Sequence, residues 1–166
     1  MNLLLSTSVL FLISANSFAT KLTDLKIDAK WMVKYDPNEW SYIYLKPTLK
    51  ISPNIFEYRK DKIRVVLQRE THFDEAVDYQ KLVERKCAEA NQYYSKKASG
   101  HSEIVNINFK KVCYIEYKNV SGEMTHQFVY PELSQNKSYD IYSYGWNSNN
   151  HKSKEIVINF LKGFLQ

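Results

Sequence analysis

The fold of this chain is decided by residues Asp74 to Tyr117, which read DEAVDYQKLVERKCAEANQYYSKKASGHSEIVNINFKKVCYIEY. The first half of this stretch places small, apolar and aromatic residues at alternating steps of three and four, which puts them on one side of an α-helix. These residues are Ala76, Tyr79, Val83, Cys87, Ala90 and Tyr94. Asp74 is a suitable N-cap, and Gly100 follows two lysines at the other end. The spacing therefore predicts a long amphipathic helix.

The second half of the stretch predicts a strand that carries the other cysteine. Val112 to Tyr117 is rich in β-branched and aromatic residues. Alternation places Cys113, Ile115 and Tyr117 on one face of that strand. If this face packs against the apolar stripe of the helix, Cys87 and Cys113 meet in the core. Two cysteines in an exported chain are more typical of a disulfide than of a nucleophile, so we predict a bond between them.

The rest of the chain outside this stretch is predicted to form mainly strands. The predicted strands are Lys30 to Tyr35, Trp40 to Leu45, a strand around Ile63 to Gln68, Glu103 to Phe109, Val112 to Lys118, Glu123 to Tyr130, and Ser138 to Trp146. Asp36, Pro37 and Asn38 predict a turn, and Asn119 to Gly122 predicts a tight hairpin connection. The segment between Pro47 and Pro53 is predicted to be an edge strand or a loop.

A second helix is predicted at the end of the chain, from Ser153 to Leu165. Its apolar stripe comprises Ile156, Val157, Phe160, Leu161 and Phe164. Asn150 or Ser153 is a suitable cap for its start. Because a block of consecutive strands separates the two helices, the sheet should be largely antiparallel and the fold class α+β, with the long helix central and the second helix C-terminal.

The first 19 residues have the features of a signal peptide. Met1 to Ala19 contains no charged side chain, has an apolar run from Leu3 to Ile13, and ends in Ser17, Phe18 and Ala19. A membrane anchor is the alternative, but a span needs about 20 apolar residues and this run is shorter. We predict cleavage after Ala19 and one domain over residues 20–166, periplasmic or secreted, with no membrane span after cleavage.

Composition and motifs exclude several functions and leave others open. The 23 basic and 18 acidic residues give a formal charge of +5, but they are interspersed, so we expect no nucleic-acid partner. The four histidines have no metal-like spacing, and the chain's four glycines form no phosphate-binding motif, so we expect no metal and no cofactor. A catalytic site assembled from distant residues would leave no such signature. His126, between Met124 and Phe128, is expected to be a hydrogen-bonded core histidine.

The element order and two local motifs resemble those of the PsbP-like superfamily. This family includes photosystem II extrinsic subunits, Mog-type Ran-binding proteins and small exported bacterial proteins. The motifs are Tyr35-Asp-Pro-Asn-Glu-Trp40, which looks like an early Pro-x-x-Trp turn, and the closing helix from Ile156 to Phe164. The resemblance covers about Lys30 to Gln166 and implies an αβα sandwich that binds or supports other proteins. No functional residue of the family can be transferred to this chain.

Aromatic residues predict a candidate partner-binding surface. Alternation sends Tyr114 to the face of the sheet opposite Cys113, and the last strand places three further aromatic residues on one face. The candidate residues are Tyr114, Tyr142, Tyr144, Trp146 and Asn147. Aromatic side chains with polar tips beside adaptable Asn and Ser are typical of interfaces. The alternative is that the terminal helix covers this face.

Together these observations favour an exported, non-enzymatic binding or accessory domain that acts on a protein or cell-envelope partner. Two other functions remain open at this point. One is a small secreted hydrolase with a dispersed active site. The other is an immunity-type inhibitor protein.

Overall fold

The computed structural model describes residues 22–27, 32–44, 54–73, 78–96, 100–133 and 138–163. The predictions for Met1 to Ala19, for the segment between Pro47 and Pro53 and for the Asp74 cap lie outside these residues. Within them, no helix is long and apolar enough to cross a membrane. The elements in chain order are β1 (Thr23–Lys26), β2 (Met32–Tyr35), β3 (Trp40–Ile43), β4 (Asn54–Tyr58), β5 (Ile63–Phe73), α1 (Tyr79–Ser95), β6 (Gly100–Ile107), β7 (Lys110–Lys118), β8 (Met124–Leu133), β9 (Ser138–Asn147) and α2 (Ser153–Leu161).

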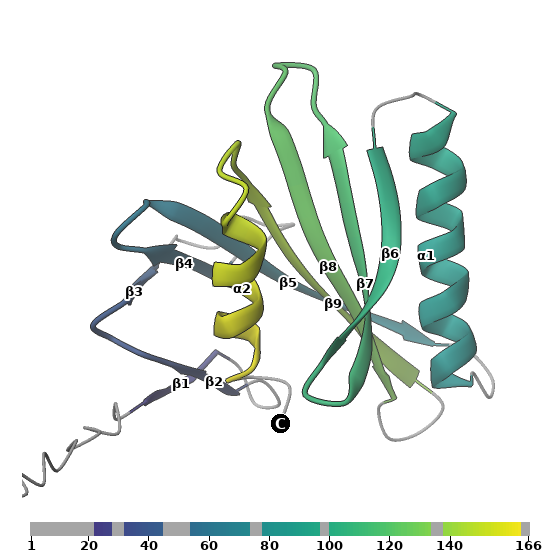
Figure 1. The fold of residues 1–166 in the computed structure, drawn as a ribbon. Coiled ribbons are helices and arrows are strands. Elements are labelled where there is room, and N and C mark those ends of the chain that lie inside the picture. The colour runs from purple at the N-terminus through teal and green to yellow at the C-terminus, as the bar shows by residue number, and fades with distance from the viewer. Residues whose placement is uncertain are drawn as a thin grey trace, which may run out of the picture.

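A seven-stranded antiparallel sheet forms the centre of the molecule, in the order β3-β4-β5-β9-β8-β7-β6. It consists of two meanders, β3 to β5 and β6 to β9, which join where β5 pairs with β9 (Figure 1). β1 and β2 form a separate two-stranded ribbon. The predicted α+β class with a largely antiparallel sheet is confirmed.

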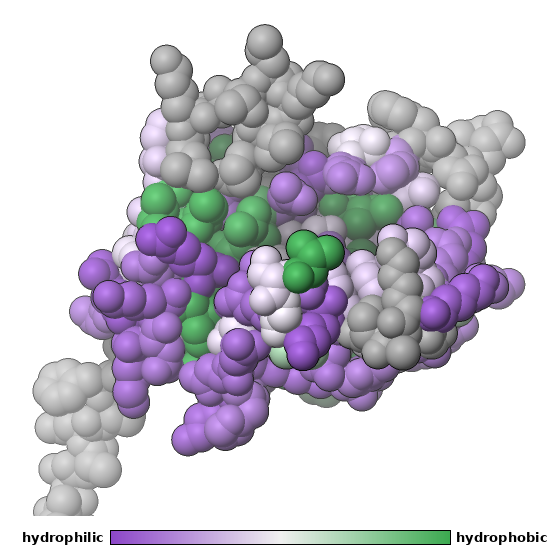
Figure 2. All heavy atoms as spheres, turned by 90° about the horizontal axis from the view of Figure 1, so that it is seen from above, coloured by the Kyte–Doolittle hydropathy of each residue, from purple (hydrophilic) through white to green (hydrophobic). Residues whose placement is uncertain are grey.

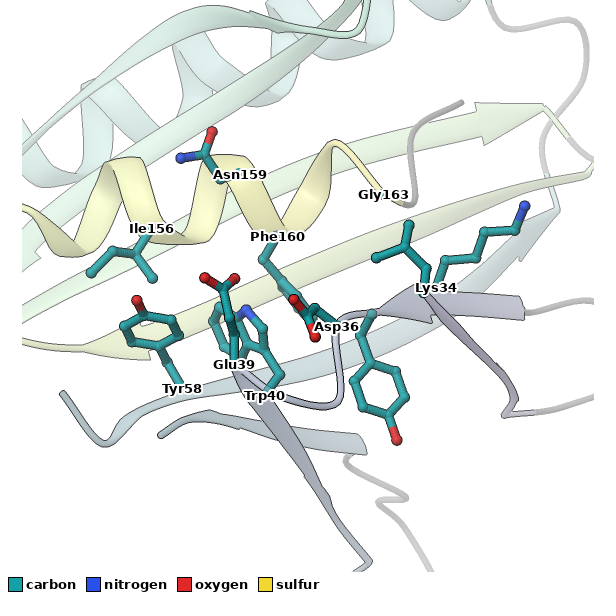
Figure 3. Close-up of a pocket in the computed structure, with 11 residues that line it drawn as sticks. Lys34, Asp36, Glu39, Trp40, Tyr58, Ile156, Asn159, Phe160 and Gly163 are labelled. Atoms are coloured by element: carbon teal, nitrogen blue, oxygen red, sulfur yellow. The ribbon is translucent and has the colours of Figure 1, made fainter. Parts of the chain in front are cut away.

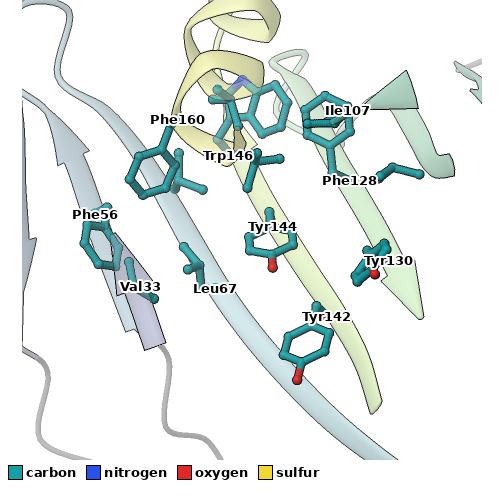
Figure 4. Packing of buried hydrophobic residues seen from close by; sticks show 14 of the residues in the cluster. Val33, Phe56, Leu67, Ile107, Phe128, Tyr130, Tyr142, Tyr144, Trp146 and Phe160 are labelled. Atoms are coloured by element: carbon teal, nitrogen blue, oxygen red, sulfur yellow. The ribbon is translucent and has the colours of Figure 1, made fainter. Parts of the chain in front are cut away.

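The two helices cover opposite faces of the sheet. In β7, Cys113 and Ile115 belong to a buried cluster with α1 residues, whereas Tyr114 belongs to a second cluster with α2 residues. Figure 4 shows the second cluster, where Phe160 of α2 lies over side chains of β5, β8 and β9. This alternation along one strand follows from the two-residue period of β-structure.

The prediction of a long central helix is not confirmed. α1 has 17 residues and packs against β6, β7 and β8, at one end of the sheet rather than across its centre. Its predicted apolar stripe is correct where the side chains are described: Val83 and Cys87 are buried, and Ala90 and Tyr94 pack at the margin of the same cluster. The part of this face formed by β5 and the adjoining ends of β8 and β9 is therefore not covered by α1.

The Cys87–Cys113 disulfide is present and joins α1 to β7, with 5.4 Å between the two Cα atoms. Ser102 of β6 donates a hydrogen bond to the Cys87 carbonyl oxygen at 2.6 Å, so β6 is also tied to the helix. Covalent and polar contacts thus hold α1 to the edge of the sheet.

Both predicted turns are confirmed. The Asn38 backbone N–H donates to Asp36 Oδ1 at 2.8 Å and sets the turn before β3. The β7–β8 hairpin is closed by Asn119, whose side-chain oxygen accepts the N–H groups of Ser121 and Glu123, each at 3.0 Å. Gly122 has φ +80°, a conformation that costs glycine little.

The structure differs from the sequence predictions in several details, among them that β6 ends at Ile107 instead of Phe109 and α2 ends at Leu161. β4 was not predicted, and β5 continues as a strand through Thr71 to Phe73 because these residues pair with β9. The residue before α2 is Lys152, which makes no side-chain cap bond, but Asn150 Oδ1 accepts the Lys152 backbone N–H at 3.0 Å and closes the turn that leads into the helix. Ser153, the other predicted cap, does not cap the helix. The Ser153 hydroxyl accepts a hydrogen bond from the Trp146 indole instead.

Seen from above, the end of the molecule that carries the β7–β8 hairpin is mostly hydrophilic at its rim, and hydrophobic residues gather between the hydrophilic ones (Figure 2). Val120 in this hairpin is fully exposed. It is a single exposed apolar side chain, which is ordinary for a soluble surface.

Candidate binding site

The predicted aromatic residues share one face of the sheet, as expected, but that face is buried. Tyr114, Tyr144 and Trp146 are only 1–2% exposed, and Tyr142 is 7% exposed. They pack in one cluster with Val157, Phe160 and Leu161 of α2. The interpretation of these four residues as an exposed surface is therefore corrected in favour of the alternative, in which the terminal helix covers them.

The phenol groups on this face are held in their neutral form. Burial is the main cause that raises the pKa of Tyr142 to about 12, and burial also raises the pKa values of Tyr114 and Tyr144 above their ordinary value. Tyr114 donates a hydrogen bond to Glu116 Oε2 at 2.6 Å, which raises its pKa further. These groups therefore belong to the core.

His126 is a core histidine, as predicted. Its Nδ1 lies 2.8 Å from the Tyr114 hydroxyl, and its Nε2 lies 2.9 Å from the Ser148 carbonyl oxygen. Because a carbonyl oxygen only accepts, Nε2 must carry the proton of that bond. The ring stacks on Trp146 with 5.0 Å between centroids, so neither nitrogen is available to a substrate.

Asn147, the fifth predicted residue, is exposed and lies in a groove on the other face of the sheet. The groove has a volume of about 510 Å³ and occupies the part of the α1 face that the helix does not cover. Its lining comes from β5, β8, β9 and the adjacent turns: Lys62, Arg64, Val66, Gln68, Glu123, Thr125, Gln127, Ser143, Gly145, Trp146 and Asn147.

Strand alternation explains the polar lining of the groove. In β5, Ile63, Val65 and Leu67 point into the core, so the intervening residues point into the groove. The outer positions of β8 and β9 add further amide and hydroxyl groups. Asn147 Oδ1 accepts a hydrogen bond from the Thr125 hydroxyl at 2.9 Å, which fixes the orientation of this pair.

Gly145 leaves the floor of the groove open. It lies between Val66 of β5 and Gln127 of β8 in the hydrogen-bonded ladder. A Cβ atom built at this position would meet only the His126 carbonyl oxygen, at an ordinary 3.8 Å, so the backbone does not require glycine here. The missing side chain gives a ligand access to the floor between Gln127 and Ser143.

An aromatic pair lies next to the groove but is not part of its lining. Tyr117 is the direct cross-strand neighbour of Thr125, and it stacks on Tyr94 of α1 with 4.4 Å between ring centroids. Burial, followed by the charge and hydrogen bond of Tyr117, raises the pKa of Tyr94 to about 12. The stacking holds the Tyr117 ring against α1.

Charge is confined to one end of the groove. Lys62 and Arg64 provide the basic groups there, and Arg64 Nε lies 2.5 Å from the Glu57 carboxylate. The remaining floor is uncharged. Arg64 and Gln68 fall within the predicted strand around Ile63 to Gln68, but no local sequence pattern joins them to Asn147, because β5 and β9 are far apart in the chain.

A smaller cavity of about 280 Å³ lies between α2, β2 and β3 (Figure 3). Its rim carries Asp36 and Glu39, and its floor is Trp40 stacked on Phe160 with 4.1 Å between centroids. Gly163 passes so close to β2 that a Cβ would lie 2.9 Å from the Lys34 carbonyl oxygen. The cavity follows from how α2 ends against β2, and we assign it no ligand.

Comparisons with known proteins do not identify this chain. Neither a protein-family model nor a curated protein matches it. Among the described residues, no three or more His, Cys, Asp or Glu side chains form a group suited to a metal ion.

Proposed function

We propose that this protein is an exported, non-enzymatic binding module whose groove holds a hydroxyl-rich chain such as a glycan of the cell envelope. One observation carries this proposal. Three adjacent strands present uncharged hydrogen-bonding side chains to one open groove, whose floor is left free by Gly145. Convergent polar groups in a preformed concave surface are the usual features of a ligand site.

The chemistry of the lining fits a neutral polar ligand. Gln68, Gln127 and Asn147 each offer an amide, which both donates and accepts hydrogen bonds. Thr125 and Ser143 add hydroxyl groups with the same double capacity. Sugar hydroxyls, which both donate and accept hydrogen bonds, need partners of this kind.

The same lining supports binding more than catalysis. A hydroxyl nucleophile needs an adjacent general base, and the residues that line the groove include no histidine. Glu123 is the carboxylate among them, and it lies at the turn that leads into β8. His126 is engaged at both nitrogens, so it cannot serve as the base.

Export is supported by the disulfide. Such bonds form and persist in oxidising compartments and are rare in the reducing cytosol. The Cys87–Cys113 bond therefore agrees with the signal peptide inferred from Met1 to Ala19. The PsbP-like resemblance remains a prediction, and a partner protein at the same groove is the alternative ligand that the experiment must distinguish.

The test is capture of envelope material by two matched variants. Gly145→Tyr fills the groove from its floor, whereas Val120→Tyr adds the same ring to the exposed β7–β8 hairpin. We expect the wild type and Val120→Tyr to capture saccharide from envelope extract, and Gly145→Tyr to lose capture by at least about tenfold while melting at the wild-type temperature.

Two treatments of the extract identify the ligand class. Periodate, which cleaves vicinal diols, should abolish capture, and exhaustive proteolysis should leave it unchanged. Capture that survives periodate but not proteolysis would instead establish a protein partner. Equal capture by Gly145→Tyr and the wild type would exclude the groove.

A further inference from the structure

The β6–β7 hairpin has a turn whose sequence does not suit its backbone. Ile107 and Lys110 are paired, so the loop contains two residues, Asn108 and Phe109, with φ angles of +48° and +66°. Positive φ at both central positions defines the type I′ turn, for which Asn-Gly is the favoured sequence. Asn108 fits its position, but a phenylalanine stands where glycine is favoured.

The conformation of Phe109 is not compensated by packing. A bulky residue with positive φ is an outlier, because its Cβ crowds the backbone. The side chain is fully exposed, so the described fold buries none of the ring. Strain of this kind at an exposed residue indicates a use outside the fold.

The tip is held in place. The Asn108 side-chain amide donates a hydrogen bond to the Lys162 carbonyl oxygen at 2.6 Å, just beyond the end of α2. The β6–β7 turn lies at the end of the sheet opposite the β7–β8 hairpin (Figure 1). Phe109 is therefore presented on a tethered projection.

Three lysines lie close to the hairpin tip, one of which, Lys162, donates from its amino group to Asn159 Oδ1 at 3.0 Å. Lys110 and Lys111 follow Phe109 directly, and Lys162 is joined to the tip through Asn108. Lys111 forms a pair with Glu84 at 3.5 Å, and the Lys110 amino group lies 5.3 Å from the centre of the Tyr130 ring. The three lysines outnumber the one carboxylate named here, Glu84, so these groups leave the tip with a net positive charge.

We propose that this hairpin tip docks reversibly on an anionic lipid surface. Phe109 enters the interface between headgroups and acyl chains, and Lys110, Lys111 and Lys162 face the lipid phosphates. An exposed aromatic ring beside several lysines is the combination that peripheral proteins use, because apolar insertion and charge attraction add. This site is separate from the polar groove, which lies on the face of the sheet beside α1.

Sedimentation with lipid vesicles tests the proposal. The purified mature protein, residues 20–166, is mixed with vesicles of phosphatidylcholine alone or with one third phosphatidylglycerol. We expect binding to the anionic vesicles that falls with added salt, and binding at least about tenfold weaker to the neutral ones. Equal binding to both compositions would overturn the proposal. Binding to neither would also overturn it and would favour a protein partner for the exposed ring.

Three variants separate the contributions. Phe109→Gly should weaken vesicle binding by about tenfold, while raising the melting temperature because the turn strain is relieved. Lys110→Gln should weaken binding by about fivefold at low salt. Val120→Ser, which removes an exposed apolar side chain from the opposite hairpin, should leave binding unchanged. Undiminished binding by Phe109→Gly would contradict the role of the ring.

Discussion

Trp146 belongs to β9 and contacts both the start of α2 and the ring of His126. Its indole N–H donates to the buried Ser153 hydroxyl at 3.0 Å, and its ring lies against His126 and Phe128. Alternation predicted the shared face of the aromatic residues from sequence alone. Alternation alone could not predict that this face is buried, because its burial depends on the face of the sheet against which α2 packs.

Trp146→Ala should destabilise the protein by about 3–5 kcal/mol, the usual cost of removing a large buried aromatic side chain. Trp146→Phe, which keeps most of the apolar volume, should cost clearly less. Chemical denaturation of both variants measures the difference in the free energy of unfolding. Wild-type stability in Trp146→Ala would contradict the burial of this side chain.

The Tyr114 hydroxyl is hydrogen-bonded to both Glu116 and His126. Tyr114→Phe keeps the ring but leaves both partners without this bond, so we expect a loss of about 1–3 kcal/mol. Tyr44→Phe, at an exposed tyrosine, is the matched control and should change stability by less than about 0.5 kcal/mol. Equal stability of the two variants would show that the Tyr114 hydroxyl contributes nothing.

At the scale of elements, the stretch from α1 to β7 was the most predictable part of the chain. Its helical and strand periodicities are both strong, and they brought Cys87 and Cys113 to facing positions. β4 was not predicted: the segment between Pro47 and Pro53 was interpreted as an edge strand or a loop, and β4 begins directly after it. The groove could not be predicted, since it requires β5 to pair with β9, far along the chain.

The disulfide should stabilise the protein by reducing the conformational entropy of the unfolded chain. The two cysteines are 26 residues apart, and closing a loop of that size is worth about 3 kcal/mol in the entropy model. The Cys87→Ala, Cys113→Ala double variant should therefore melt at a markedly lower temperature but still fold cooperatively. Thiol titration of the native protein gives the control: two reactive thiols before reduction would contradict the bond.

At the scale of the whole molecule, the buried Tyr142 phenol and the half-buried Tyr94 phenol should make the fold sensitive to alkali. The pKa values of Tyr94 and Tyr142 are raised to about 12, whereas an unfolded tyrosine titrates near 10. Above pH of about 10 the unfolded chain loses these protons before the folded chain does. The contribution of the two neutral phenols to the free energy of unfolding is therefore complete below that pH and is lost as the pH rises toward 12.

We therefore expect the phenolate absorbance of these residues to appear together with the loss of circular dichroism, not before it. A parallel titration at equal protein concentration measures both signals. Reversible ionisation of all tyrosines near pH 10, with the circular dichroism unchanged, would contradict the burial of these phenols.

The central claim is that the open part of the sheet beside α1 is the binding site. Backbone amide shifts of the isotope-labelled protein, recorded while a soluble envelope glycan is added, test this most directly. We predict progressive changes at Gln127, Ser143, Gly145 and Asn147, with the resonances of Phe109 and the α2 end unchanged. Saturable shifts that cluster away from β5, β8 and β9, or no shifts at all, would contradict it.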